Sequence, residues 1–203
     1  VLLALVIIDS WIIEDMKFIR PVDHKPYFAK PAGISFLQDQ TRPFRSFVLP
    51  GTMPNQNSLA MFGLEQVAGY HGNQLRWYNQ FLGDGFSNLL GNPFGLALTN
   101  SRFLIMRREV SHPNLEMVKS SGGINIYQNK IVMPRGRIVY DYTVVPDPDS
   151  ALWLILQPDF DHLGKIVIDR TPSREIKPPE SAQNDFVQFL DSPPDQIRVK
   201  VYL

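Results

Sequence analysis

The chain has 203 residues, with 20 Lys and Arg, 20 Asp and Glu, and no cysteine. A balanced charge gives no global field that would attract nucleic acid, so we expect no nucleic-acid partner. The lack of cysteine excludes disulfides, thiolate catalysis and Cys-ligated zinc or iron-sulfur sites. The length is sufficient for one domain or one and a half, with a sizeable core.

The chain begins with an apolar run over residues 1–13, in which Trp11 lies near the end and which Glu14, Asp15 and Lys17 follow. A bilayer span takes about 20 apolar residues, so this run is too short to cross a membrane alone. It also lacks the basic start of a signal peptide. Two interpretations stay open: a buried core segment, or the end of a transmembrane helix over residues 1–19 with Trp11 as an interfacial anchor.

Short helices and strands are predicted for the next part of the chain, after a linker punctuated by Pro26 and Pro31. The stretch over residues 51–101 is rich in Asn, Gln and Gly. Apolar spacing and turn residues predict the following elements. They are helices over residues 32–40, 74–82 and 89–98, the last interrupted near Pro93, and strands over residues 44–49 and 103–106.

The second half predicts strands over residues 124–127, 137–145 and 165–169, with a helix over residues 149–156 that starts at Asp147-Pro148. Residues 171–195 are rich in Pro, Ser, Glu and Asp, which is typical of a linker. Alternation over residues 197–203 predicts a strand cut short, whose partners would follow downstream. The expected fold is α+β, a mixed sheet with short helices, over residues 20–170.

No residue spacing in the chain matches a known catalytic or cofactor motif. The four histidines are far apart, and Asp159-Phe160-Asp161 opens like a calcium loop but lacks the later oxygen ligands and the closing Glu. The chain contains no GxGxxG, no P-loop and no GxSxG elbow. We therefore predict no catalytic residue, no metal site and no cofactor within the chain.

Aromatic and hydrogen-bonding residues gather in the stretch over residues 69–82. Aromatic faces stack on sugar rings, and amides and guanidinium groups bind hydroxyls, which makes this stretch a candidate ligand site. The candidate contacts are Tyr70, His71, Asn73, Arg76 and Trp77. Alternatively, Leu75, Tyr78 and Leu82 fall at helical spacing and form a core stripe, an interpretation that burial of Arg76 and Trp77 would favour.

Several short segments in this order resemble the extracytoplasmic part of the YfhO family of bacterial polytopic membrane proteins, which are related to glycosyltransferases that use polyprenyl-phosphate sugars. The resemblance covers most of the chain. The segments are Ile8-Asp9-Ser10-Trp11, residues 69–82, Asn88-Leu89-Leu90, Arg102-Phe103-Leu104-Ile105, Ile126-Tyr127-Gln128-Asn129, Met133-Pro134-Arg135, Val139-Tyr140 and Asp159-Phe160-Asp161.

The resemblance implies that residues 1–19 end a transmembrane helix, that residues 20–170 form an extracytoplasmic domain, and that residues 196–203 begin a β-rich domain. It implies a location at the bacterial cytoplasmic membrane and a sugar-transfer reaction whose acidic catalytic residue lies in an early membrane loop outside this chain. The expected partners are the lipid bilayer and a polyprenyl-phosphate sugar or envelope glycan. The alternative is a non-catalytic binding or scaffolding region of an envelope protein.

Overall fold

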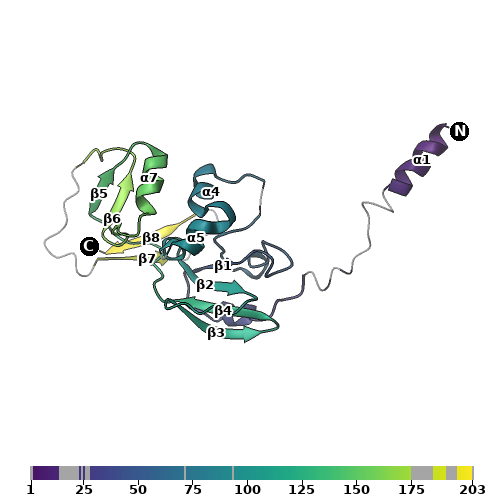
Figure 1. The fold of residues 1–203 in the computed structure, drawn as a ribbon, viewed down its shortest axis with the longest axis horizontal. Helices are drawn as coiled ribbons and strands as arrows, with labels where there is room; N and C mark the ends of the chain where they lie inside the picture. The colour runs from purple at the N-terminus through teal and green to yellow at the C-terminus, as the bar shows by residue number, and fades with distance from the viewer. Residues whose placement is uncertain are drawn as a thin grey trace. The chain divides into compact units, whose positions relative to one another are not determined.

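A computed structural model describes residues 2–13, 23, 25, 28–70, 72–92, 94–174, 185–190 and 196–202 (Figure 1). The chain divides into two compact units, Val1–Lys30 and Pro31–Leu203. The helices are α1 (Leu2–Ile13), α3 (Ile34–Gln38), η2 (Ala60–Phe62), α4 (Arg76–Leu82), η3 (Asp84–Phe86), α5 (Ser87–Gly91), α6 (Gly95–Leu98) and α7 (Pro148–Ile155). The strands are β1 (Arg45–Val48), β2 (Ser101–Met106), β3 (Leu115–Ser121), β4 (Ile124–Asn129), β5 (Asp141–Val144), β6 (Lys165–Ile168), β7 (Phe186–Leu190) and β8 (Arg198–Tyr202).

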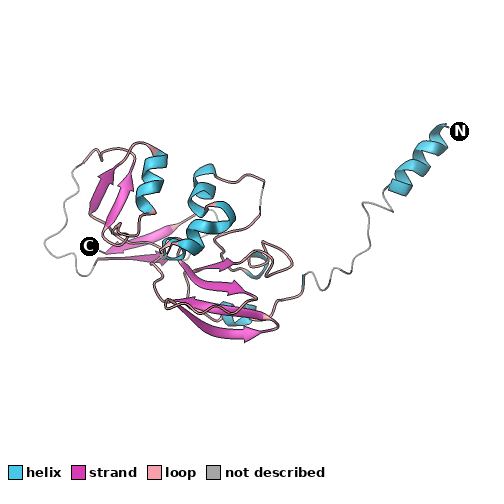
Figure 2. Cartoon of the chain, viewed as in Figure 1, coloured by secondary structure: helices cyan, strands magenta, loops and turns pink. Residues whose placement is uncertain are grey.

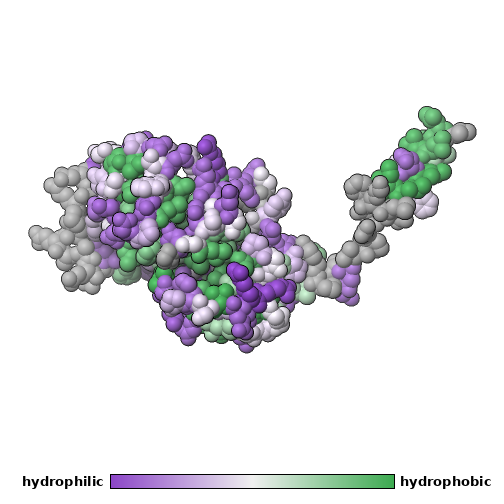
Figure 3. Space-filling model, viewed as in Figure 1, coloured by the Kyte–Doolittle hydropathy of each residue, from purple (hydrophilic) through white to green (hydrophobic). Residues whose placement is uncertain are grey.

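The first unit contains α1, a 12-residue helix with no buried side chain. The exposed fraction of its large apolar side chains runs from 39% at Ile13 to 80% at Leu2, and the face of this helix seen in Figure 3 is mostly hydrophobic. None of the helices among the described residues is long and apolar enough to cross a bilayer. The assignment of residues 1–19 to the end of a transmembrane helix therefore stays a prediction.

A four-stranded mixed sheet in the order β1-β2-β4-β3 is the centre of the second unit (Figure 2). Strands β1 and β2 are parallel, while β4 is antiparallel to both β2 and β3. With the short helices around it, this sheet confirms the predicted α+β class with a mixed sheet. The predicted strands at residues 44–49, 103–106 and 124–127 correspond to β1, β2 and β4.

Each face of the central sheet has its own hydrophobic core, because successive side chains of a strand point to opposite faces. Phe103 and Ile105 of β2 pack into a cluster that includes Ile34 and Leu37 of α3. Leu104 belongs to the other cluster, together with Leu82, Leu89 and Leu96 of α4, α5 and α6. Helices therefore cover both faces, and the second cluster supports the helix that carries the candidate site.

Strand β3 was not predicted from the sequence. It joins β4 through Gly122 and Gly123, with φ of 58° and 72°, and Ser121 pairs with Ile124. A two-residue loop with positive φ at both positions is the hairpin turn whose twist matches paired strands, and glycine adopts it without steric cost.

A parallel pair, β5 and β6, follows the central sheet, and α7 lies between the two strands in the sequence. The side chain of Asp147 caps α7 by accepting a hydrogen bond from the Ser150 amide at 2.8 Å, and Pro148 occupies the first turn. The predicted helix start is thus confirmed. The strand predicted over residues 137–145 is shorter in the structure, where β5 begins at Asp141.

The C-terminal part of the chain corrects one prediction. Strand β7 falls within residues 171–195, where composition indicated only a linker, and it pairs antiparallel with β8. The alternating run at the end of the chain therefore has a partner strand upstream, within the same chain. Phe186 stacks on Tyr202 across the pair, with ring centroids 4.2 Å apart.

Candidate functional site

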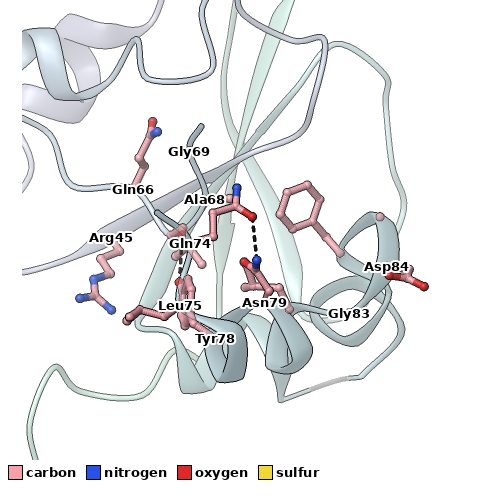
Figure 4. A pocket seen from close by; sticks show the side chains of 14 residues that line it. Arg45, Gln66, Ala68, Gly69, Gln74, Leu75, Tyr78, Asn79, Gly83 and Asp84 are labelled. Carbon is pink, nitrogen blue, oxygen red and sulfur yellow. Dashed lines mark hydrogen bonds between the residues drawn. The ribbon is translucent and has the colours of Figure 1, made fainter. Parts of the chain in front are cut away.

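A pocket of about 610 Å³ lies beside α4 in the second unit. Its wall includes residues 67–69 and 83–85. Figure 4 shows the polar side chains around it, with Arg45 at one end and Asp84 at the other. The polar side chains that line it are Arg45, Gln66, Gln74, Tyr78, Asn79 and Asp84.

Helix α4 holds its part of the wall through contacts on both sides. Leu82 is buried in the core below the helix, and the Tyr78 hydroxyl donates a hydrogen bond of 2.6 Å to the Val67 carbonyl. Burial raises the pKa of the Tyr78 hydroxyl, although the positive charges of Arg45 and Arg135 oppose this shift. Tyr78 therefore stays protonated as a hydrogen-bond donor and ties the helix to the opposite wall.

Amide groups supply most of the remaining hydrogen-bonding capacity of the pocket. Asn79 Nδ2 donates to Gln74 Oε1 at 2.7 Å, which leaves the second N–H of Asn79 and the carbonyl oxygen of its side chain for other partners. Gln66 Nε2 donates to the Gln56 carbonyl at 2.7 Å. Gln66 Oε1 is buried and accepts no hydrogen bond from the described residues, so it is a free acceptor in the wall.

The five predicted contact residues do not line this pocket where they are described. Tyr70 is 70% exposed, and its backbone is held by Asn57, which donates to the Tyr70 carbonyl at 2.8 Å and accepts from the Tyr70 amide at 2.9 Å. Asn73 and Arg76 are exposed. His71 lies outside the described residues. Their sequence neighbours Gly69, Gln74 and Leu75 line the pocket instead.

Trp77 lies on a different surface of α4 from the pocket. It is 45% exposed, and the Arg76 guanidinium lies 4.8 Å from the centroid of its ring. Together with Phe81 and with Leu152 and Ile155 of α7, it lines an apolar groove of about 430 Å³. Trp77, a predicted ligand contact, and the pocket are therefore on separate surfaces of one helix.

The predicted core stripe of this helix is only partly present. Leu82 is buried and Tyr78 is half-buried, but Leu75 is 75% exposed. The physical reason is that Leu75 is the N-cap residue and has extended backbone angles, φ −69° and ψ 121°. Helical spacing therefore does not apply to it, and its side chain leaves the line of Tyr78 and Leu82.

The pocket is lined by hydrogen-bonding side chains. Within the ranges that the structure describes, no three His, Cys, Asp or Glu residues lie close enough to hold a metal ion. Amides, a phenol and one charge of each sign at the ends offer donors and acceptors to a neutral, polar ligand. Hydroxyl groups, which both donate and accept, match this set.

Comparisons of the chain with models of known protein families, with curated proteins and with solved structures found no match. The assignment of a function therefore depends on the geometry above and on the sequence resemblance.

Proposed function

We propose that this chain is the extracytoplasmic module of a bacterial membrane glycosyltransferase that uses lipid-linked sugars for cell-envelope glycosylation. In this proposal α1 is the end of a transmembrane helix. The pocket beside α4 binds a sugar donor or envelope glycan, and the catalytic residue lies outside this chain.

The observation that carries the proposal is the set of amide side chains around the pocket. Gln66, Gln74 and Asn79 present both donors and acceptors, and Gln66 Oε1 is a buried acceptor without a partner among the described residues. A buried acceptor without a donor costs about 1–3 kcal/mol, which a hydroxyl of the ligand would recover. Tyr70 and Trp77, which the sequence also predicts as ligand contacts, are exposed but do not line this pocket.

A non-catalytic scaffolding region is the second candidate, and one observation favours it. Tyr78 and Asn79 already make hydrogen bonds within the chain, to Val67 and Gln74. Side chains that are engaged in this way stabilise the position of α4 whether or not a ligand is present.

The test is a titration of the full chain with a panel of monosaccharides, among them glucose, galactose, mannose and N-acetylglucosamine. Asn79→Ala removes an amide of the pocket. Gln157→Ala is the matched control, because it removes an amide that follows the end of α7 and does not line the pocket. We expect Asn79→Ala to weaken binding about tenfold, the loss of roughly one hydrogen bond, and Gln157→Ala to leave it unchanged. Saturable binding by none of the sugars would support the scaffolding candidate.

Trp77→Ala separates the pocket from the surface that the sequence predicts. If this variant weakens binding while Asn79→Ala does not, the sugar lies against the aromatic ring and outside the pocket. If Trp77→Ala leaves binding unchanged, the prediction that Trp77 contacts the ligand is wrong.

A further inference from the structure

Five arginines line two adjoining cavities of the second unit, of about 590 and 880 Å³. They are a quarter of the 20 Lys and Arg in a chain of zero net charge. No Asp or Glu lies among the described residues that line either cavity. We call this surface the arginine groove: Arg42, Arg45, Arg102, Arg135 and Arg137.

One carboxylate reaches the groove from its edge and is shared by two of the arginines. Glu65 Oε2 lies 2.8 Å from Arg135 Nη2 and 3.4 Å from Arg45 Nε. The Arg135 side chain is only 18% exposed, so its charge is poorly screened by water. Burial and the nearby charge of Arg45 lower the pKa of Arg135, and Glu65 compensates for only part of this effect.

Arg137 has hydrogen-bonding capacity that the described residues do not use. Its Nε is buried and has no hydrogen-bond partner among them, and its Nη1 contacts only the weak acceptor Sδ of Met133, at 3.8 Å. Asn100, which is buried and lines the same cavity, is fixed by a hydrogen bond from Nδ2 to the Met133 carbonyl at 2.7 Å. A guanidinium with an unsatisfied buried donor needs an anionic acceptor more than the solvated arginines of the surface do.

We propose that the arginine groove binds the phosphate group of a phosphorylated ligand. Guanidinium groups bind phosphate through paired N–H donors, and the excess of positive charge in the groove matches a dianion better than a single carboxylate. The walls add apolar surface from Phe44 and Phe189, against which the rest of the ligand would pack. This inference does not depend on a sugar in the α4 pocket, because the two sites are tested with different ligands.

The test is calorimetric titration of the full chain, in mild detergent, with inorganic pyrophosphate. Arg137→Gln removes the guanidinium whose Nε has no partner among the described residues, and Arg42→Gln removes an exposed guanidinium of the groove. Arg170→Gln is the control, because the Arg170 side chain is 87% exposed and lies outside the groove. We expect Arg137→Gln to weaken binding by about tenfold or more, the loss of a charge-assisted hydrogen bond, and Arg170→Gln to change it less than about twofold. Arg137→Lys keeps the charge but loses the planar fork, and we expect intermediate affinity.

The proposal is overturned if pyrophosphate does not saturate the chain, or if the groove variants bind it as the control does. Should Arg137→Gln fail to fold, Arg42→Gln alone decides, because its side chain is exposed. Association of the chain with phosphatidylcholine vesicles, measured with and without phosphatidic acid, identifies the source of the phosphate. Any association through the apolar helix α1 is the same in both samples, so a difference between them comes from the phosphatidic acid headgroup. Stronger association with phosphatidic acid that Arg137→Gln abolishes indicates a lipid headgroup, and pyrophosphate binding without this difference indicates a soluble phosphate.

Discussion

Replacing Gly95 with alanine tests the close packing of α5 against α6, on which the second core cluster depends. A Cβ at this position would lie 2.3 Å from the Asn88 carbonyl oxygen and 2.7 Å from the Leu89 Cα, and both are backbone atoms. Overpacking of this kind costs about 1–3 kcal/mol. Alanine in a helix recovers about 0.5–1 kcal/mol relative to glycine. We expect a net loss of about 1–2 kcal/mol in the free energy of unfolding.

Thermal unfolding followed by circular dichroism measures this loss, which corresponds to a decrease of about 2–8 °C in Tm for a unit of this size. Gly91→Ala is the matched control, because Gly91 ends α5 and a Cβ there meets no atom within 4 Å. The control should keep or raise the stability of the wild type. If Gly95→Ala is as stable as Gly91→Ala, then α5 and α6 do not approach as closely as described.

Two further predictions concern a loop contact and a helix cap. Asn57→Ala removes both hydrogen bonds that hold the Tyr70 backbone. At about 0.5–1.5 kcal/mol each, their loss should lower the free energy of unfolding by about 1–3 kcal/mol and speed hydrogen exchange at the Tyr70 amide. Equal exchange rates in the variant and the wild type would contradict the contact. The hydrogen bonds from Ser150 lower the pKa of the Asp147 carboxyl below its ordinary value of 3.8. A carboxyl whose folded pKa is lowered stabilises the fold above its ordinary pKa and loses this contribution as the pH falls through the folded pKa. Asp147→Asn keeps an N-cap side chain that does not titrate. Its free energy of unfolding, measured with urea at several pH values, should match that of the wild type near pH 7 and fall less below about pH 4. Identical pH profiles of the two proteins would refute this role of Asp147.

Elements with strong local signals were predictable from the sequence. The buried run Phe103-Leu104-Ile105-Met106 falls within β2, and Asp147-Pro148 begins α7 as expected. Strand β3 was missed because its side chains are mostly exposed, so no buried stripe marks it. The Gly122-Gly123 pair before Ile124 was the available signal, since two adjacent glycines between short strands favour a hairpin. Strand β7 was missed because its five residues, Phe186–Leu190, lie within a longer stretch whose Pro, Ser and acidic residues are typical of a linker.

The candidate site was predictable only in the part that comes from one helix. The aromatic stretch pointed to α4, but the pocket also needs Arg45 from β1, Gln66 from the loop after η2 and Asp84 from η3. Local periodicity carries no information about such convergence, because the tertiary structure decides which distant segments meet. The wealth of Asn, Gln and Gly over residues 51–101 was the one sequence signal for a polar site, and it gave neither the residues nor the geometry.

Arg45 connects the two proposed binding sites, because it lines both the α4 pocket and the arginine groove. Arg45 lines both sites because the chain after η2 pairs with the edge of β1 beside it. The Ser46 amide donates to the Glu65 carbonyl at 3.0 Å and the Val67 amide donates to the Ser46 carbonyl at 3.0 Å, so this short stretch runs along β1. The pairing brings Glu65 to the Arg45 side chain and Gln66 to the pocket. A substitution at Arg45 would therefore change both sites at once, whereas Asn79 and Arg137 each line only one of them. Sugar binding lost in Asn79→Ala but kept in Arg137→Gln, with the reverse for pyrophosphate, would establish two independent sites that share Arg45 in their walls.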